Sequence, residues 1–260
     1  MDIRAYNRLM WDKQVENGNP WTVPVSPEVI AAARQGTWSV LLTEIKPVPR
    51  SWFPEDFTGL DVLGLACGGG QQGPIFAVLG ARVTILDNSP RQLGRDQEVA
   101  QREGLSIRTV EGDMRDLSNF TDESFDLVFN PVSNCFIHEI RPVWQEAFRV
   151  LRPGGMLLAG FNNPAFYVFD FPKSEQGIFE VRYKLPFDSR QLSKAERRYE
   201  FGDDSPLEFS HSLEDQIGGQ LEAGFVLTGL YEDKQNSKLG EYIPAYIATR
   251  AIKPEFLEED

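Results

Sequence analysis

The stretch from residue 60 to residue 73 constrains the fold of this chain more than any other. An apolar run typical of a buried strand ends in three consecutive glycines, Gly68, Gly69 and Gly70, after which the pattern becomes helical. Glycine has no Cβ and adopts positive φ readily, so such a turn lets backbone amides approach a ligand where a strand ends. The stretch therefore predicts a nucleotide-type binding site.

The glycine spacing is open to two interpretations. Gly68, Gly70 and Gly73 match the G-x-G-x-x-G pattern of dinucleotide-binding proteins. Asp87 follows Gly68 by 19 residues, where such proteins place an acid that binds a ribose. Another nucleotide-like cofactor would use the same strand, turn and helix, so the rest of the chain has to decide between them.

Length and charge limit the class of protein. With 260 residues, 41% of them hydrophobic, the chain can bury the core of one large α/β domain. Its formal net charge of -13 repels a phosphate backbone, and no basic cluster longer than Arg197-Arg198 offsets that repulsion. Nucleic acid is therefore an unfavourable partner, and a small molecule is the better substrate class.

Cysteine content and hydropathy indicate the compartment. Cys67 and Cys135 are too few for a disulfide framework, and free buried cysteines usually pack as small apolar residues. We find neither a basic segment followed by an apolar run near Met1 nor ~18 consecutive apolar residues. We therefore expect a cytoplasmic protein without a signal peptide or a membrane span.

Short apolar runs alternate with amphipathic ones from residue 60 onward, which is typical of a sheet with crossover helices. The expected strands are Asp61–Ala66, Ala81–Asp87, Ile107–Glu111, Phe125–Asn130, Met156–Phe161, Val226–Tyr231 and Tyr246–Ile252. The expected helices are Tyr6–Glu16, Glu28–Ile45, Ser89–Gly104, Ile140–Leu151 and Ser212–Gly224. The predicted fold is α/β: a seven-stranded, mostly parallel, doubly wound Rossmann-like sheet with helices on both faces, an antiparallel last strand and a small cap.

Several motifs occur in the order found in one family. Val62–Gly70, Asp87, Gly112-Asp113-Met114, Phe125–Phe129 and Leu151–Gly155 resemble the motifs of class I S-adenosylmethionine-dependent methyltransferases, especially the small-molecule branch that includes ubiquinone/menaquinone-type enzymes. The resemblance covers residues 60–163 in register. It implies S-adenosylmethionine as cofactor, S-adenosylhomocysteine as product, and methyl transfer by in-line displacement to a small organic acceptor.

The resemblance also implies residue roles. The glycine turn would lie under the methionine part of the cofactor, Asp87 would hold both ribose hydroxyls, and Asp113 and Met114 would border the adenine. Many relatives have an acid on the first strand where this chain has Gly64, so the cofactor's ammonium would need another partner. The residues expected to contact the cofactor are Ala66, Cys67, Gly68, Gly70, Gln71, Asp87, Asn88, Gln92, Gly112, Asp113, Met114, Asn130 and Pro131.

Two other functions stay open. No Arg or Lys lies between Leu60 and Ala81, which suits a sulfonium cofactor and gives the extra phosphate of NADP no partner there. An NAD(P)-dependent oxidoreductase nevertheless fits the glycine spacing. The absence of the acid at Gly64 is also compatible with a non-catalytic S-adenosylmethionine-binding regulator.

The chain divides into four segments on this interpretation. Residues 1–50 would form an N-terminal helical cap or lid, 51–163 the cofactor-binding core, 164–210 an inserted substrate cap, and 211–260 the last helix and strands of the sheet. Within the insert, apolar residues alternate with charged ones from Phe179 to Leu185, which predicts a strand outside the main sheet.

Candidates for acceptor binding rest on their position along the chain. His138 follows the fourth strand and is the candidate general base, against a capping or surface role, while His211 is expected to cap the last helix. Neither histidine has carboxylates at ligand spacing, so no metal site is predicted. The candidate substrate contacts are Tyr6, Trp11, Asn134, Phe166 and Tyr167. The first two would either form a lid over the cofactor or anchor the N-terminal helix to the sheet. The aromatic pair would either line an acceptor pocket or form the core of the insert.

Overall fold

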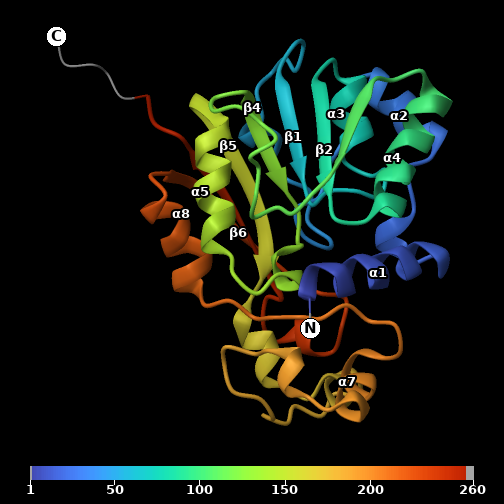
Figure 1. Ribbon diagram of the computed structural model, residues 1–260, viewed down its shortest axis with the longest axis vertical. Helices are drawn as coiled ribbons and strands as arrows, with labels where there is room; N and C mark the ends of the chain where they lie inside the picture. The colour runs from blue at the N-terminus through green and yellow to red at the C-terminus, as the bar shows by residue number, and fades with distance from the viewer. Residues whose placement is uncertain (1, 256–260) are drawn as a thin grey trace.

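The computed structural model describes residues 2–255, and its central element is a seven-stranded sheet (Figure 1). The strands lie in the order β3-β2-β1-β4-β5-β7-β6; β1 to β5 are parallel, and β7 is antiparallel to both of its neighbours. Their bounds are β1 Asp61–Leu65, β2 Arg82–Asp87, β3 Ile107–Glu111, β4 Phe125–Asn130, β5 Leu151–Asn162, β6 Val226–Asp233 and β7 Tyr246–Ile252. The predicted fold class and the seven predicted strands are confirmed.

Helices cover both faces of this sheet because its central strands are apolar on both sides. In β1, Val62 packs into one core and Leu63 into the other, as expected for side chains that alternate across a strand. Helices α2, α3 and α4 cover the first face, and α5 and α8 cover the second (Figure 1). The helix bounds are α1 Ile3–Glu16, α2 Pro27–Arg34, α3 Gly73–Val78, α4 Pro90–Glu103, α5 Arg141–Val150, α6 Phe171–Glu175, α7 Lys194–Phe201 and α8 Gly219–Glu222. Short 3-10 helices occur at Pro20–Thr22, Arg50–Trp52, Asn134–Phe136, Pro164–Val168, Ser189–Gln191 and Leu239–Glu241.

Helix α4 begins directly after β2, as predicted. The hydroxyl of Ser89 accepts the N–H of Gln92, Pro90 occupies the first turn, and Gly104 ends the helix with φ of 66°. Its N-terminus therefore lies beside the carboxyl end of β2.

The predicted helix Glu28–Ile45 is wrong beyond Arg34, where α2 ends. Gly36 has φ of 86°, which stops the helix, and the following residues are not helical. Val40 and Leu42, two residues apart, are both buried in the core, and Leu42 O accepts the N–H of Val132 at 2.9 Å. Residues 41–44 therefore run past the end of β4.

The predicted strand Phe179–Leu185 is also wrong. A single bridge joins Phe169 to Val181, and the N–H of Arg182 donates to Val168 O at 2.7 Å. Val181 is 72% exposed, so the alternating pattern belongs to a surface segment that has no neighbouring strand to complete a ladder.

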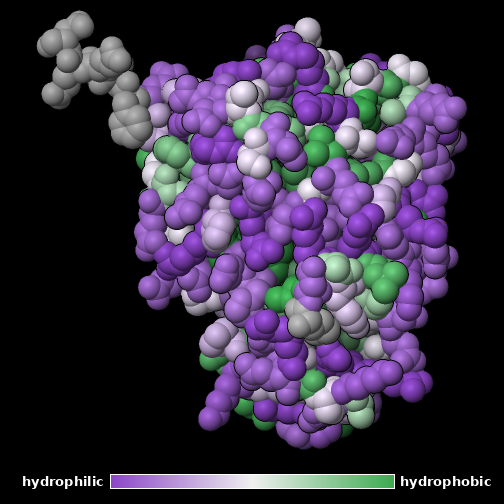
Figure 2. Space-filling model, viewed as in Figure 1, coloured by the Kyte–Doolittle hydropathy of each residue, from purple (hydrophilic) through white to green (hydrophobic). Residues whose placement is uncertain are grey.

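The segments outside the sheet gather at one edge of it. Residues 164–210, with α6 and α7, lie beneath the edge where the parallel strands end, and α1 lies across the same edge (Figure 1). The predicted helix Ser212–Gly224 is present as a π-helical turn at Glu214–Gly218 followed by α8. Figure 2 shows a mostly hydrophilic face on which apolar side chains form small separate groups. Within residues 2–255, no helix has the length and apolar character needed to cross a membrane.

Candidate active site

A cavity of about 610 Å³ lies at the carboxyl ends of the parallel strands, where open α/β sheets bind their ligands. The glycine turn after β1 and the ends of β2, β3 and β4 line it, together with residues of α1 and of the segment 201–208. The volume falls within the ~300–1,000 Å³ typical of small-molecule sites. Its size and position make this cavity the candidate active site.

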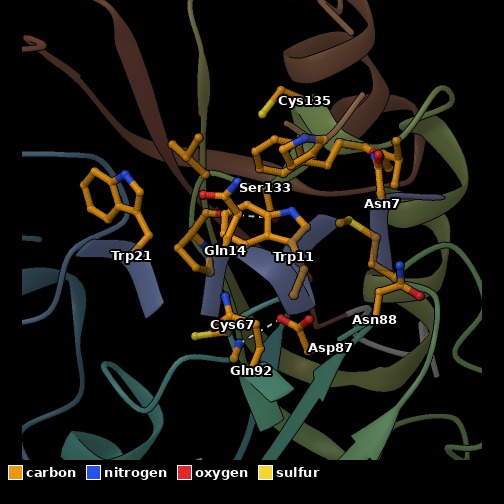
Figure 3. A pocket seen from close by; sticks show the side chains of 18 of the residues that line it. Asn7, Trp11, Gln14, Trp21, Cys67, Asp87, Asn88, Gln92, Ser133 and Cys135 are labelled. Carbon is orange, nitrogen blue, oxygen red and sulfur yellow. Dashed lines mark hydrogen bonds between the residues drawn. The ribbon is translucent and has the colours of Figure 1, made fainter. Parts of the chain in front are cut away.

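Asp87, at the end of β2, is the charged centre of the wall and faces the glycine turn (Figure 3). Its Oδ2 accepts the N–H of Gly68 at 2.9 Å, and its Oδ1 accepts the N–H of Ser89 at 2.9 Å. Burial raises the pKa of Asp87 to about 6, although these donors favour the ionised form. A Cβ at Gly68 would lie 2.7 Å from Gln92 Cβ and 2.9 Å from Asp87 Oδ2, so a side chain does not fit there.

A second carboxylate lies behind the glycine turn. Asp96 in α4 is fully buried, and burial raises its pKa well above the usual value; neither of its carboxylate oxygens has a hydrogen-bond partner among the described residues. Gly70 has φ of 69°, and a Cβ there would lie 2.7 Å from Arg95 O. Gly70 therefore packs against α4 and does not line the cavity, and its contact with the cofactor stays a prediction.

Asp113 and Met114 form the wall at the β3 end of the cavity. Burial acts to raise the pKa of Asp113, but hydrogen bonds from Arg115 outweigh it and hold that pKa below its usual value. Arg115 Nη2 donates to Asp113 Oδ2 at 2.7 Å, and Arg4 Nε donates to Asn88 Oδ1 at 3.1 Å. Arg4 and Arg115, the two arginines among the described residues that line the cavity, are therefore both hydrogen-bonded to side chains at the β2 and β3 end.

The wall around Asp87 fits the cofactor that the sequence predicts. Gln92 is buried and lines the cavity, and its Oε1 has no hydrogen-bond partner among residues 2–255. Buried polar atoms are nearly always paired, so this oxygen indicates a ligand that donates hydrogen bonds, as ribose hydroxyls and an ammonium do. The cradle at Gly68, the Asp87 carboxylate and this amide together suit S-adenosylmethionine.

Helix α1 closes the cavity on the side away from the strands. Trp11 extends toward the cavity and packs edge-on against Phe136, with ring centroids 5.0 Å apart (Figure 3). Asn7 is 3% exposed; its Nδ2 donates to Phe136 O at 2.7 Å and to Leu207 O at 3.0 Å, and its Oδ1 accepts the N–H of Leu207 at 2.7 Å. These bonds tie α1 to the loop after β4 and to the segment before β6.

The end of the cavity beyond β4 is acidic. Tyr167 donates its hydroxyl to Glu208 Oε2 at 2.8 Å, and Tyr246 donates its hydroxyl to Glu44 Oε2 at 3.0 Å. Both glutamates line the cavity, and burial raises the pKa of both tyrosines above its usual value. Burial also raises the pKa of Glu208 to about 7, against the hydrogen bond from Tyr167. Cys135 packs against Tyr167 and lines the same end, and burial raises the pKa of its thiol.

Most of the predicted site residues lie in the wall of this cavity. Those that line it are Trp11, Ala66, Cys67, Gly68, Gln71, Asp87, Asn88, Gln92, Gly112, Asp113, Met114, Pro131 and His138. Those that do not line it are Tyr6, Gly70, Asn130, Asn134, Phe166 and Tyr167.

Hydrogen bonding accounts for the two asparagines outside the wall. Asn130 is fully buried, and its Nδ2 donates to Leu65 O at 2.9 Å, which joins the ends of β4 and β1. Asn134 is also fully buried, and its Nδ2 donates to Gln216 Oε1 at 3.1 Å. Their amides therefore connect elements of the fold behind the wall.

Packing accounts for the three aromatic residues outside the wall. Phe166 belongs to an apolar cluster with Tyr246, and Tyr167 lies behind Glu208, to which it donates its hydroxyl. On α1, the face toward the cavity is set by Asn7, Trp11 and Gln14. Tyr6 precedes Asn7 by one residue and is rotated by about 100° from that face, since an α-helix has 3.6 residues per turn.

The two histidines have different surroundings. His138 lines the cavity, its side chain is 45% exposed, and its Nε2 lies 4.0 Å from Asp188 Oδ2. His211 is buried, which lowers its pKa, and its Nε2 lies 2.9 Å from Asn134 O and 3.0 Å from Ile137 O. His211 thus joins the loop after β4 to the segment before α8 and does not cap that helix.

Sequence reasoning missed several residues that line the cavity: Asn7, Gln14, Glu44, Glu208 and Tyr246. Asn7 and Gln14 share a helix face with Trp11, at spacings of four and three residues, so the helical pattern could have found them. The other three lie in separate segments and are part of no motif.

Comparisons with known proteins agree with this geometry. A model of the methyltransferase domain matches residues 63–159. The uncharacterized methyltransferase YbaJ of Bacillus subtilis is 50% identical over 250 residues, which cover 96% of this chain and 98% of that protein. A demethylmenaquinone methyltransferase of Tropheryma whipplei is 30% identical over 145 residues, 55% of this chain and 57% of that protein, so the ubiquinone/menaquinone-type branch stays a prediction.

A solved structure shows the same fold. The S-adenosylmethionine-dependent methyltransferase of Mesorhizobium loti matches with a TM-score of 0.61 at 18% identity, covering 78% of this chain and 94% of that one. The glycine turn, the acid after β2 and the near full-length likeness to YbaJ lead to one conclusion. This chain belongs to the S-adenosylmethionine-dependent methyltransferases.

Proposed function

We propose that this methyltransferase methylates a small organic acceptor that binds between the end of β4 and residues 201–208. The continuity of the cavity carries the proposal: one space joins the wall around Asp87 to an end lined by Cys135 and Glu208. A cofactor bound at the first end leaves room for an acceptor at the second. A non-catalytic regulator would have no need of that second end.

S-adenosylmethionine supplies an electrophilic methyl group on a sulfonium. In this proposal Asp87 accepts hydrogen bonds from the ribose hydroxyls, Met114 borders the adenine, and the backbone of Gly68 lies under the methionine part. Helix α1 and residues 201–208 exclude water and hold the acceptor atom about 3 Å from the methyl carbon, which supplies much of the catalysis in a direct displacement.

The contacts that α1 makes across the cavity favour a small acceptor rather than a macromolecular one. Trp11 and Asn7 of α1 contact the loop after β4, and Lys13 of the same helix bonds Asp204 at 2.6 Å. A protein side chain or a nucleobase on a long chain would have to displace these contacts. The net charge of -13 disfavours nucleic acid further.

The test uses S-adenosylmethionine labelled in the methyl group and an extract of Bacillus subtilis, the organism that contains YbaJ. Ultrafiltration separates the extract into small molecules and macromolecules, and each fraction is incubated with the purified protein. We expect label to enter the small-molecule fraction with release of S-adenosylhomocysteine. Label in the macromolecular fraction alone, or no release with either fraction, contradicts the proposal.

A further inference from the structure

We propose that the methyl acceptor is a small amine, which the acidic end of the cavity binds and deprotonates. The inference rests on the proposed function and names the substrate class of the same site. It is carried by the position of Glu44 and Glu208, by the charges around them, and by an unpaired carboxylate oxygen of Glu208 at that end of the cavity.

The acidic end lies too far from Asp87 to serve the ribose. Asn162 ends β5 and pairs in register with Tyr246 of β7, whose hydroxyl donates to Glu44. In the sheet order, β5 is three strand spacings from β2, which is about 14 Å at 4.8 Å per spacing. Glu44 and Asn162 therefore face a ligand beyond β4, where the acceptor is proposed to bind.

The charges at this end favour a cation. Glu44 and Glu208 line the cavity, and neither forms an ion pair within residues 2–255, whereas Asp203, which also lines it, pairs with Arg198 at 3.0 Å. The arginines that line the cavity form their hydrogen bonds beside β2 and β3. His138 also lines the cavity but faces Asp188, at 4.0 Å. A carboxylate, phosphate or phenolate acceptor would be repelled here, whereas an ammonium would be attracted because Coulomb interactions are strong away from bulk water.

The free acceptor at this end of the cavity suits a ligand that donates hydrogen bonds. Tyr167 donates to Oε2 of Glu208, and no residue in 2–255 donates to Oε1. Glu208 is half-buried and lines the cavity, so a bound ligand can reach this oxygen. A protonated amine carries N–H donors for it, while an ether, ketone or tertiary amide carries none.

The chemistry balances without a further reactant. Glu208 takes one proton from the bound ammonium, which frees the nitrogen lone pair. The lone pair forms the N–C bond to the methyl carbon, and the S–C bond breaks with its electron pair staying on sulfur, which gives S-adenosylhomocysteine. The proton on Glu208 passes to solvent. The pKa of Glu208, raised by burial to about 7, suits a group that exchanges a proton near neutral pH.

The decisive experiment divides the small-molecule extract of Bacillus subtilis on a cation exchanger before labelled S-adenosylmethionine is added. We expect acceptor activity in the retained, cationic fraction. Activity in the unretained fraction, which holds neutral and anionic molecules, overturns the amine inference and leaves the proposed function standing. Transfer to macromolecules alone, or no transfer at all, overturns the proposed function itself.

A variant pair tests the role of Glu208 separately. We expect Glu208→Gln to lower kcat/KM for the retained fraction at least tenfold, with the Kd for S-adenosylmethionine unchanged. Glu175→Gln makes the same change of charge at an exposed position of the insert and serves as the control. If Glu208→Gln binds the cofactor and retains full activity, the assignment of Glu208 is overturned. Glu44→Gln, expected to raise KM, gives a second test should Glu208→Gln fail to fold.

Discussion

At the scale of single residues, Asp87 determines how the cofactor end of the cavity responds to pH. Its carboxylate already accepts N–H groups from Gly68 and Ser89, and the cofactor's hydroxyls would add to these. Burial raises its pKa to about 6, and the neighbouring Asp12 acts in the same direction. Without cofactor, the Asp87 carboxyl group of the folded protein therefore holds its proton more tightly than it does in the unfolded chain. Below pH 6 this proton has to leave before the carboxylate can accept hydrogen bonds from S-adenosylmethionine.

We predict that the Kd for S-adenosylmethionine rises as the pH falls through 6, by up to about tenfold per pH unit if the ionised form alone binds. Calorimetric titrations from pH 5 to pH 8 measure this. Asp87→Asn cannot titrate and serves as the control, with weaker binding that does not change over this interval. A wild-type Kd that stays constant from pH 8 to pH 5 contradicts the role of Asp87.

Gly68 is the second residue whose identity the site requires. A Cβ there would lie 2.7 Å from Gln92 Cβ and 2.9 Å from Asp87 Oδ2, so Gly68→Ala forces the turn away from both. We predict a loss of cofactor affinity of at least tenfold, with a smaller loss of stability because the turn lies beyond the carboxyl end of β1, outside the paired part of the strand. Gly94→Ala, where a Cβ meets nothing within 4 Å, is the matched control. Equal affinities of the two variants would exclude a close fit at Gly68.

At the scale of elements, α1 acts as a roof that polar bonds hold in place. Asn7 is its buried anchor, and Asn7→Ala leaves Leu207 N–H and two carbonyls without their partner. We predict a loss of about 2–3 kcal/mol in the free energy of unfolding, because each buried unpaired group costs about 1–3 kcal/mol and some become hydrated. Urea unfolding measures it, with Leu9→Ala, at a position 54% exposed, as control. A loss below about 0.5 kcal/mol for Asn7→Ala would mean that α1 is held by other contacts.

Some helices and strands can be predicted from local sequence patterns alone, and others cannot. The strands and α4 follow from local signals, namely apolar runs and the cap at Ser89, because nearby residues determine them. The helix expected over Glu28–Ile45 stops at Arg34, since Gly36 adopts a positive φ and both Val40 and Leu42 are buried, which propensity alone does not reveal. In the insert, the alternating residues around Val181 have no partner strand, which no local pattern can indicate.

At the scale of the whole molecule, the two ends of the cavity differ in how far the sequence predicts them. The cofactor end is built from the ends of consecutive strands, so Asp87 and Asp113 are found by counting along the chain. The acceptor end brings together Glu44, Glu208 and Tyr246 from three distant segments, and only the folded chain reveals their proximity. Tyr167, a predicted substrate contact, does not line the cavity itself but donates its hydroxyl to Glu208, which does.

Calorimetric titration of the purified protein with S-adenosylmethionine, and separately with NAD(H), shows whether this cavity is an S-adenosylmethionine site. We expect saturable binding of S-adenosylmethionine at one site per chain, displaced by S-adenosylhomocysteine, and no heat of binding with NAD(H). Binding of NAD(H) without binding of S-adenosylmethionine would contradict this expectation.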